Sequence, residues 1–403
     1  MVLSFRVDGS FCGSSYQNDA NPMNGFMNVC FYLKKGRAGL AVSTVMFLPL
    51  LVAVAATSPI APPDTTLIDD RDREAPRQNR LTYAVGADIS FLRQAEQRST
   101  VFKDKGQAKP GLQIFKDHGY NWIRLRLFHT PTQLPNDLPY TIALAQDAKK
   151  LGFKFLLDFH YSDTWADPGK QFLPKAWEGK SHAELVQAVF EYTRDTLARF
   201  GEAGVMPDMV QPGNEVSGGM LWPDGKLPAN WDNFAELLKA GIRGVEAVRS
   251  AGAHPLVMVH IDKGANQKAT KYFFDRLNTY GIKFDVIGQS YYPWWHGTID
   301  ELRENLAFMA TEYQKDIVVV EAAYNWRPAE YRNKEAPFPE TPEGQRQFLD
   351  EVNRAVRAAP HDRGKGVFWW EPAVPPGRNS RGMFDTEGDA LPVMTVFDKD
   401  GAK

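Results

Sequence analysis

The chain has very little cysteine. Its 403 residues include two, Cys12 and Cys30, and both precede an apolar stretch at residues 38–56. If that stretch is removed after export, the remaining protein contains no thiol. A domain of this size has enough core to fold without disulfides. The lack of cysteine therefore excludes a thiolate nucleophile and a cysteine-ligated zinc site.

The chain also lacks an excess of either charge. Its formal net charge is −2, from 47 basic and 49 acidic residues, so no basic surplus favours nucleic-acid binding. Hydrophobic residues make up 43% and charged residues 24%, which is typical of a soluble globular protein. Several of the ten tryptophans lie in loops with glycine and proline. Exposed rings of this kind suit stacking on sugars, although core packing explains most tryptophans in most proteins.

The apolar stretch has the pattern of an export signal. Lys34, Lys35 and Arg37 precede it, and it ends in small residues at Ala56. A basic segment, an apolar segment and small residues in that order are typical of a secretory signal peptide. We therefore expect cleavage near Ala56 and a secreted or periplasmic protein.

This interpretation divides the chain into three parts. Residues 1–56 are expected to be an N-terminal extension and signal peptide, 57–80 a flexible leader, and 81–403 the folded, functional domain. Two alternatives remain open. In the first, translation starts at Met27. In the second, the apolar stretch, which is long enough to span a bilayer, is not cleaved and remains as a membrane anchor. No stable membrane partner is expected beyond that segment.

From residue 81 onward, short apolar or alternating runs are followed by longer amphipathic ones. Expected strands cover 83–87, 122–128, 154–159, 209–211, 256–260, 286–290, 317–320 and 366–370. Expected helices include 142–151, 183–200, 234–250, 268–280, 299–313 and 342–356. Strands that alternate with helices eight times predict a single (β/α)8 barrel, a TIM barrel.

Two glutamates stand at the ends of predicted strands. Glu215 closes the run that starts at Met209, and Glu321 closes the run that starts at Asp316. Most lone glutamates in such places are solvated and inert. Here Asn214 directly precedes Glu215, and aromatic residues crowd the loops after other strands. Two facing carboxyl groups can cleave an acetal, one as an acid and one as a nucleophile or base, so the pair indicates a glycosidase.

Strand parity places two arginines inside the barrel. In the run 122–128, the apolar residues alternate with Arg124 and Arg126. Helices cover the outside of a barrel, so the arginines should point inward, where they need carboxylate partners. Asp158 and His160 alternate in the same way on the third strand. An arginine near Glu321 would keep that carboxylate ionised, whereas Arg124 and Asp158 are expected to form a structural ion pair.

Several segments of the folded part form a set that occurs together in order along the chain. They are 86–88, 124–128, 157–168, 211–215, 290–297, 320–322 and 369–372. The most specific of them contains the run Asp-Phe-His-Tyr-Ser-Asp-Thr-Trp-Ala-Asp-Pro at residues 158–168. Together these segments resemble glycoside hydrolase family 53, the arabinogalactan endo-beta-1,4-galactanases, and the resemblance covers about residues 83 to 397.

The resemblance implies endo-hydrolysis of beta-1,4-linked galactan, the side chain of type I arabinogalactan and pectin, with retention of anomeric configuration. It implies that Glu215 is the acid/base and Glu321 the nucleophile. Retention requires carboxyl groups about 5 to 5.5 Å apart. Asn214 would bind the hydroxyl beside the anomeric carbon, where the bond tightens in the transition state.

The same resemblance implies roles for the surrounding residues. Arg126 and Tyr292 would position Glu321, and His160 would help to hold the floor of the site beside Asp158. The aromatic residues are expected to stack on galactose rings, with Trp370 at the cleavage point. These stacking residues are Trp165, Trp294, Trp295 and Trp370, and for Trp165 and Trp295 packing under a loop is an equally open alternative.

Three other functions remain as alternatives. A related retaining barrel glycosidase would act on mannan, xylan or beta-glucan with the same glutamates. A metal-dependent barrel hydrolase would use histidines near strand ends, but the first strand lacks a His-x-His pair. A binding protein with a dead site would hold sugar without cleaving it. We predict no cofactor and no metal, a polysaccharide as the binding partner, and a monomer. The histidines are His129, His160, His260 and His296.

Overall fold

The fold is that of a computed structural model, which describes residues 81–249, 252–328, 336–375 and 379–398. The expected signal segment and leader lie outside the described residues. Within those ranges, no helix combines the length and the apolar character needed to cross a membrane.

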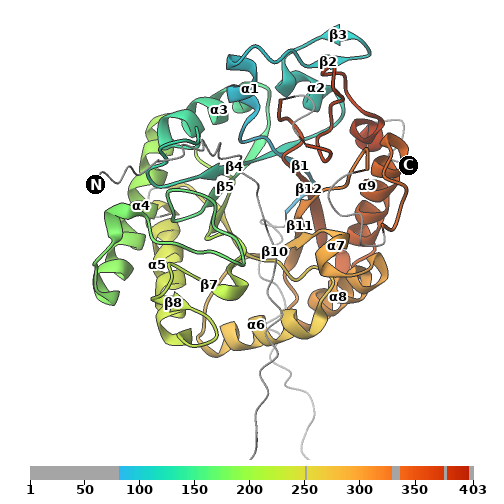
Figure 1. Ribbon diagram of the computed structural model, residues 1–403. Helices are drawn as coiled ribbons and strands as arrows, with labels where there is room; N and C mark the ends of the chain where they lie inside the picture. The colour runs from blue at the N-terminus through green and yellow to red at the C-terminus, as the bar shows by residue number, and fades with distance from the viewer. Residues whose placement is uncertain (1–80, 250–251, 329–335, 376–378, 399–403) are drawn as a thin grey trace, which may run out of the picture. The chain divides into compact units, whose positions relative to one another are not determined.

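Parallel strands form a closed barrel at the centre (Figure 1). Their order around the barrel is β1, β12, β11, β10, β9, β6, β5, β4. The predicted (β/α)8 barrel is confirmed, and each predicted strand lies within two residues of the observed bounds. These bounds are β1 (Ala84–Asp88), β4 (Trp122–Leu127), β5 (Lys154–Phe159), β6 (Met209–Pro212), β9 (Leu256–Ile261), β10 (Val286–Tyr291), β11 (Asp316–Ala322) and β12 (Gly364–Trp370).

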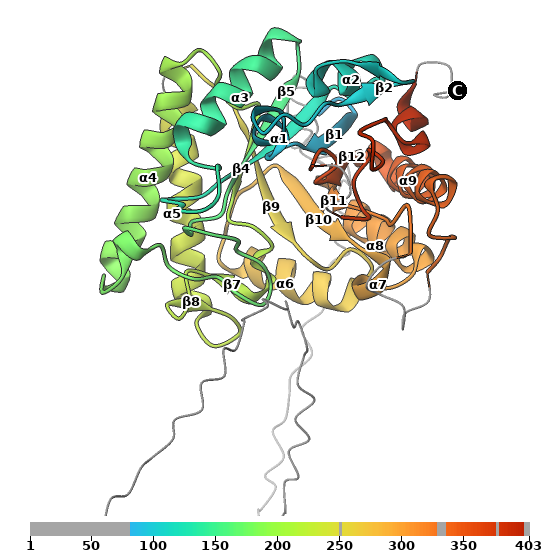
Figure 2. The ribbon, with the colours of Figure 1, turned by 45° about the horizontal axis from the view of Figure 1, so that its top comes forward.

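Helices surround the barrel, and two small hairpins lie outside it (Figures 1 and 2). The hairpins are β2 (Lys103–Asp104) with β3 (Gln107–Ala108) and β7 (Gly219–Met220) with β8 (Gly225–Lys226). The helices are α1 (Leu92–Gln97), α2 (Gly111–Asp117), α3 (Leu138–Lys150), α4 (His182–Glu202), α5 (Trp231–Arg249), α6 (Gln267–Thr279), α7 (Pro293–His296), α8 (Ile299–Glu312) and α9 (Pro342–Arg357).

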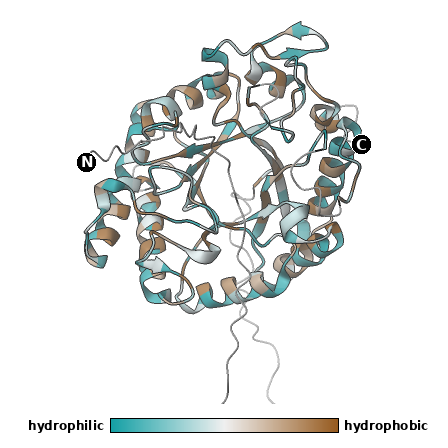
Figure 3. Cartoon of the chain, viewed as in Figure 1, coloured by the Kyte–Doolittle hydropathy of each residue, from teal (hydrophilic) through white to brown (hydrophobic). Residues whose placement is uncertain are grey.

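Local sequence explains where the outer helices begin. Ser181 and Glu184 form a capping box at the start of α4, and Thr298 and Glu301 form another at α8. Such boxes satisfy backbone N–H groups that the first helical turn leaves unpaired. Along the outer helices, polar and apolar residues alternate around the axis (Figure 3). Each helix can therefore bury one face on the barrel and expose the other.

The strand residues divide between two cores, as parity predicts. Trp122 belongs to an apolar cluster inside the barrel, with Leu156, Met209 and Phe368. Ile123, on the opposite face of the same strand, belongs to the core between the strands and the helices. This alternation turns Arg124 and Arg126 inward, and they are 0% and 1% exposed.

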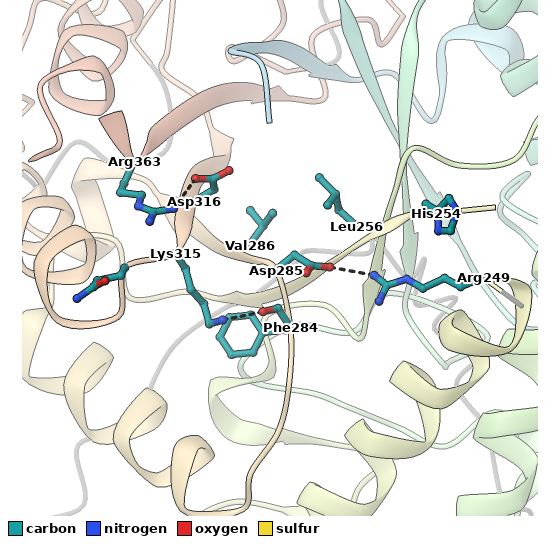
Figure 4. A pocket seen from close by; sticks show the side chains of 10 residues that line it. Arg249, His254, Leu256, Phe284, Asp285, Val286, Lys315, Asp316 and Arg363 are labelled. Carbon is teal, nitrogen blue, oxygen red and sulfur yellow. Dashed lines mark hydrogen bonds and ion pairs between the residues drawn. The ribbon is translucent and has the colours of Figure 1, made fainter. Parts of the chain in front are cut away.

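The amino ends of the strands carry a polar cavity of about 360 Å³ (Figure 4). Its arginine, lysine and aspartate side chains each have a close polar partner. Arg363 pairs with Asp316 at 3.3 Å, and Arg249 pairs with Asp285 at 3.0 Å. The Lys315 ammonium donates to a backbone carbonyl at 2.7 Å. In barrels of this type the amino-terminal face serves stability, so we assign these pairs to holding the barrel end together.

Gly86 provides a test of the inner packing. A Cβ atom at Gly86 would lie 2.2 Å from the ring of Phe368, which is fully buried. We expect Gly86→Ala to lower the free energy of unfolding by about 1–3 kcal/mol, because the interior has no room for another methyl group. Urea denaturation followed by circular dichroism measures this change.

Gly201 in α4 is the matched control. A Cβ atom there meets the flexible end of Met206 at 3.0 Å, and alanine favours a helix. Gly201→Ala should therefore leave the free energy of unfolding unchanged or raise it slightly. Equal losses in the two variants would contradict this account of the barrel interior.

Candidate active site

A cavity of about 530 Å³ opens at the carboxyl ends of the strands, where barrel enzymes hold their active sites. It brings together side chains that are far apart in the sequence. Two of the ten residues predicted for the site, Asp158 and Trp294, do not line it. Those that do are Arg126, His160, Trp165, Asn214, Glu215, Tyr292, Glu321 and Trp370.

Glu215 enters the cavity from just beyond β6. Its backbone is left-handed, with φ 47° and ψ 52°, a conformation that costs energy for a residue with a side chain. The side chain is buried, and its Oε1 accepts a hydrogen bond from the Ser290 hydroxyl at 2.6 Å. Burial raises the pKa of Glu215 well above its usual value, and the charges of Glu321 and Asp262 raise it further. Burial and the neighbouring acids therefore favour the protonated form of Glu215.

Glu321 stands on β11 in a different environment. Its Oε1 lies 2.7 Å from the Arg124 guanidinium, and its Oε2 accepts the Tyr292 hydroxyl at 2.8 Å. Burial raises the pKa of Glu321, while Arg124 and Tyr292 oppose the rise. Among the residues that the structure describes, no lysine or arginine pairs with Glu215. When the two carboxyls share one proton, it therefore stays on Glu215 and Glu321 is the carboxylate.

Arg124 connects the polar side chains that form the floor of the site. Its side chain is completely buried, and it contacts Asp88 at 3.0 Å and Asp158 at 2.8 Å in addition to Glu321. It also donates to the Asn214 side-chain carbonyl at 2.8 Å. The expected Arg124–Asp158 ion pair is therefore present, but it is part of a network that reaches the candidate catalytic carboxylate.

The prediction that Arg126 positions Glu321 is wrong. Arg126 instead pairs with Glu371 at 2.9 Å and with Asp88 at 3.2 Å. Side chains two residues apart on a strand are about 6.6 Å apart, so Arg126 lies one layer away from Arg124, the arginine that contacts Glu321. Parity determined that both arginines point inward, but it did not determine which one is level with Glu321.

Arg126 supports aromatic walls of the cavity. Its guanidinium carbon lies 4.3 Å from the centre of the Trp165 ring and 5.8 Å from that of Trp370. A guanidinium over a ring is attracted to its face and restricts its position. Arg381 lies 4.9 Å from the Trp370 ring. Trp165 and Trp370, both predicted as stacking residues, are thus held in place beside the cavity.

Asn214 and His160 join the loop after β5 to the barrel. The Asn214 amide donates to the Ala166 carbonyl at 2.9 Å, and Nδ1 of His160 accepts from the Ala166 amide at 2.9 Å. The other ring nitrogen of His160 lies 3.1 Å from Asp158. His160 therefore connects the floor to the loop that carries Trp165, in agreement with the supporting position predicted for it.

His260 determines where the Ser290 proton points. Burial lowers the pKa of His260 well below its usual value, and the charge of Arg124 lowers it further, so the ring is neutral. Its Nε2 lies 2.8 Å from the Ser290 oxygen. Because Ser290 gives its single proton to Glu215, Nε2 of His260 must be the donor to Ser290. Sequence reasoning treated His260 only as a possible metal ligand and did not find Ser290.

Trp294 is placed differently from the prediction. It is 4% exposed, and its ring stacks on Tyr324 with centres 5.1 Å apart, away from the cavity. The next residue, Trp295, is 48% exposed and lines the cavity. Successive side chains on a helix turn by about 100°, so α7 buries one indole and presents the other.

Other cavity residues were not predicted as site residues. Asp262 directly follows β9, binds Lys263 at 2.7 Å, and accepts the Ser217 hydroxyl. Its position just beyond a strand is the same signal that identified Glu215. His296 also lines the cavity, and burial lowers its pKa to about 4. Arg381 comes from the loop after β12, where no sequence pattern indicated a role.

The four histidines near strand ends do not gather around a common point. His129 contacts Thr130 at 2.8 Å, whereas His160 and His260 bind within the floor of the site. Across the described parts of the chain, no group of three or more His, Cys, Asp or Glu side chains is arranged to hold a metal ion.

A TIM barrel with two buried carboxyls in its cleft, one with its pKa raised by burial and one paired with arginine, is typical of the class of barrel glycosidases. Comparison with known protein families agrees with this class. The sequence model of glycosyl hydrolase family 53 matches residues 84–403. The chain belongs to glycosyl hydrolase family 53.

Individual relatives support this assignment. The chain is similar to an arabinogalactan endo-beta-1,4-galactanase of Humicola insolens, with 35% identity over 335 residues, which cover 77% of this chain and 98% of that protein. A similar enzyme of Cellvibrio japonicus is 35% identical over 308 residues, covering 72% and 80%. The solved family 53 catalytic domain from Ignisphaera aggregans superposes with a TM-score of 0.74 at 35% identity, covering 80% of this chain and 97% of that domain.

Ser290→Ala tests the hydrogen bond that reaches Glu215. Without the hydroxyl donor, the carboxylate form of Glu215 loses a stabilising partner, so we expect its pKa to rise further. Titration of ¹³C-labelled glutamate carboxyls by NMR measures the change, with Glu215→Gln identifying the signal. Ser162→Ala removes an equally buried hydroxyl, which accepts from the Thr164 backbone amide at 3.5 Å, and should leave the pKa of Glu215 unchanged. An unchanged or lower pKa in Ser290→Ala would contradict the assignment.

Proposed function

We propose that the protein is an exported endo-glycosidase that hydrolyses beta-1,4-galactosidic bonds of type I arabinogalactan with retention of anomeric configuration. The observation that carries the mechanism is the unequal setting of the two glutamates. Glu215 is buried near the acids Glu321 and Asp262, whereas Glu321 is buried against Arg124 and Tyr292. An acid and a nucleophile need opposite protonation states at the same pH, and these surroundings supply them.

The first chemical step breaks the glycosidic bond. Glu215 gives its proton to the departing oxygen while the carboxylate of Glu321 attacks the anomeric carbon, forming a glycosyl ester. The Tyr292 hydroxyl and Arg124, which both contact Glu321, hold the attacking group in one orientation. Ser290 occupies Oε1 of Glu215, which leaves Oε2 to carry the proton.

The second step releases the sugar. Glu215, now a carboxylate, takes a proton from water, and the water oxygen attacks the anomeric carbon and expels Glu321. Each step inverts the anomeric centre, so the product keeps the original configuration. Asn214 is held by Arg124 and by the Ala166 carbonyl at the edge of the cavity. There it is placed to bind the hydroxyl next to the reacting carbon.

Galactan is the substrate that the relatives support. The enzymes of Humicola insolens and Cellvibrio japonicus are arabinogalactan endo-beta-1,4-galactanases. The long run at residues 158–168 forms part of the site, since Trp165, Asp167 and Pro168 all line the cavity. Trp165 and Trp370 provide aromatic walls suited to the apolar faces of galactose rings.

Reducing-end release from purified polysaccharides tests the substrate. We expect cleavage of linear beta-1,4-galactan, with little or none of mannan, xylan and beta-glucan. Glu215→Ala and Glu321→Ala should each lower the rate on galactan by about a thousandfold or more, because each removes a group that acts on the reacting atoms. Glu246→Ala, which removes an exposed glutamate on α5, should match wild type. Cleavage of another glycan in place of galactan would overturn the substrate assignment.

Azide rescue tests the two roles separately, with an aryl beta-galactoside whose leaving group needs no acid. In Glu215→Ala, azide should replace water in the second step and give the beta-galactosyl azide. In Glu321→Ala, azide should enter the space of the missing carboxylate and give the alpha-galactosyl azide, because only one displacement occurs. NMR of the products distinguishes the two anomers. The opposite assignment of anomers would exchange the roles of the glutamates.

A further inference from the structure

Gln171 is a buried side chain in the loop after β5. It is 2% exposed, and its neighbour Lys170 lines the active-site cavity. The Gln171 amide nitrogen donates to the Asn214 backbone carbonyl at 2.8 Å and to the Asp167 carbonyl at 3.2 Å. Carbonyl oxygens can only accept, so the amide must present its NH2 group to both of them. The loop is thereby bonded to the peptide that joins Asn214 to Glu215.

Backbone contacts hold Gln171 in this place. Asp167 and Lys170 exchange backbone hydrogen bonds at 2.8 and 3.0 Å, which close a tight turn directly before Gln171. The Gln171 carbonyl accepts the Trp222 amide at 2.6 Å, from the turn of the β7–β8 hairpin. The backbone of Gln171 is thus bonded to a hairpin that follows Glu215 in the chain, and its side chain is bonded to the peptide that precedes Glu215.

The Asn214–Glu215 peptide is attached to strained backbone. Glu215 has φ 47° and ψ 52°, the left-handed region that costs energy for a residue with a side chain. A peptide unit is planar, so turning over the Asn214 carbonyl also turns over the Glu215 N–H and changes φ at Glu215. A half-turn of the plane would bring φ into the ordinary negative range. The observed orientation therefore needs a partner that favours it.

Gln171 supplies that partner. In the observed orientation its NH2 group meets a carbonyl oxygen. In the reversed orientation the Glu215 N–H would turn toward the same NH2 group, so that a donor would face a donor. Buried donors and acceptors without partners are costly, and this cost opposes the relief of strain. The reversal would also tilt the Cα–Cβ bond of Glu215, and a long side chain magnifies such a tilt at its carboxyl group.

We propose that Gln171 is a positioning residue for the acid: its side-chain amide holds the Asn214–Glu215 peptide in the orientation from which the Glu215 carboxyl reaches the departing oxygen. This inference rests on the proposed function, since it takes Glu215 as the acid. Gln171 acts through one hydrogen bond to the backbone and not through contact with the substrate. Proton transfer depends on placement within about 1 Å, so it is the step that loss of this bond affects most.

Gln171→Met tests the proposal, because methionine has a similar length and cannot donate. On the polysaccharide that wild type cleaves, the departing sugar needs a proton, and we expect kcat/KM to fall about a hundredfold. On a dinitrophenyl beta-galactobioside, whose leaving group departs without a proton, kcat/KM should fall by less than about threefold. A loss confined to the polysaccharide identifies a displaced acid, whereas damage to the fold lowers both values.

Gln345→Met is the matched control. Gln345 is also buried, and its amide nitrogen likewise donates to two backbone carbonyls, that of Tyr324 at 2.9 Å and that of Gly382 at 3.0 Å. This variant should lower the melting temperature about as much as Gln171→Met does. Because Gln345 is not bonded to the Asn214–Glu215 peptide, any change in kcat/KM should be the same on both substrates.

Two further variants complete the test. Gln171→Asn keeps an amide but draws it back by one methylene, so it should give a smaller loss of the same selective kind even where Gln171→Met fails to fold. Glu215→Ala is the reference and should itself lose far more on the polysaccharide. Equal losses on both substrates in Glu215→Ala would refute the acid role, and with it the proposed mechanism. A selective loss in Glu215→Ala without one in the Gln171 variants would overturn the positioning role alone.

Discussion

The ion network around Arg124 is the interaction on which the rest of the site depends. A completely buried guanidinium requires carboxylates, and it has three of them, from Asp88, Asp158 and Glu321. Removing one partner of such a network typically costs about 3–5 kcal/mol, because the remaining charges stay buried without compensation. The network also makes the electrostatic surroundings of the two glutamates different. Glu321 has a cation beside it, whereas Glu215 has a hydroxyl and another acid near it.

Residues with strained backbone lie at or just beyond the carboxyl ends of three barrel strands. Glu215 has φ 47°, Tyr161 has φ 48° and Glu371 has φ 50°, and all three directly follow or nearly follow barrel strands. Such conformations cost about 1–2 kcal/mol each for residues with a side chain. The closed barrel offsets this cost with hydrogen-bonded strands and two packed cores. The strained residues then direct the side chains of Glu215 and Glu371 to their partners Ser290 and Arg126.

The fold was predictable because its signals are local and repeated. Alternation along 122–128 indicated a strand with one apolar face, and seven other short apolar or alternating runs indicated the remaining strands. The catalytic candidates were predictable for a related reason, since parallel strands bring their carboxyl ends to one face. Any acidic residue at such an end, as Glu215 and Glu321 are, must lie near that face. Asp262 was missed although it has the same signal.

The sequence by itself determined the barrel, the inward direction of the alternating arginines and the gathering of strand-end residues at one rim. These follow from periodicity, which depends only on neighbouring residues. The tertiary structure alone decided that Arg124 rather than Arg126 meets Glu321, and that Trp295 rather than Trp294 faces the cleft. Both depend on how far one element is shifted or rotated against another, and that is determined by packing between residues distant in sequence, which no local pattern records.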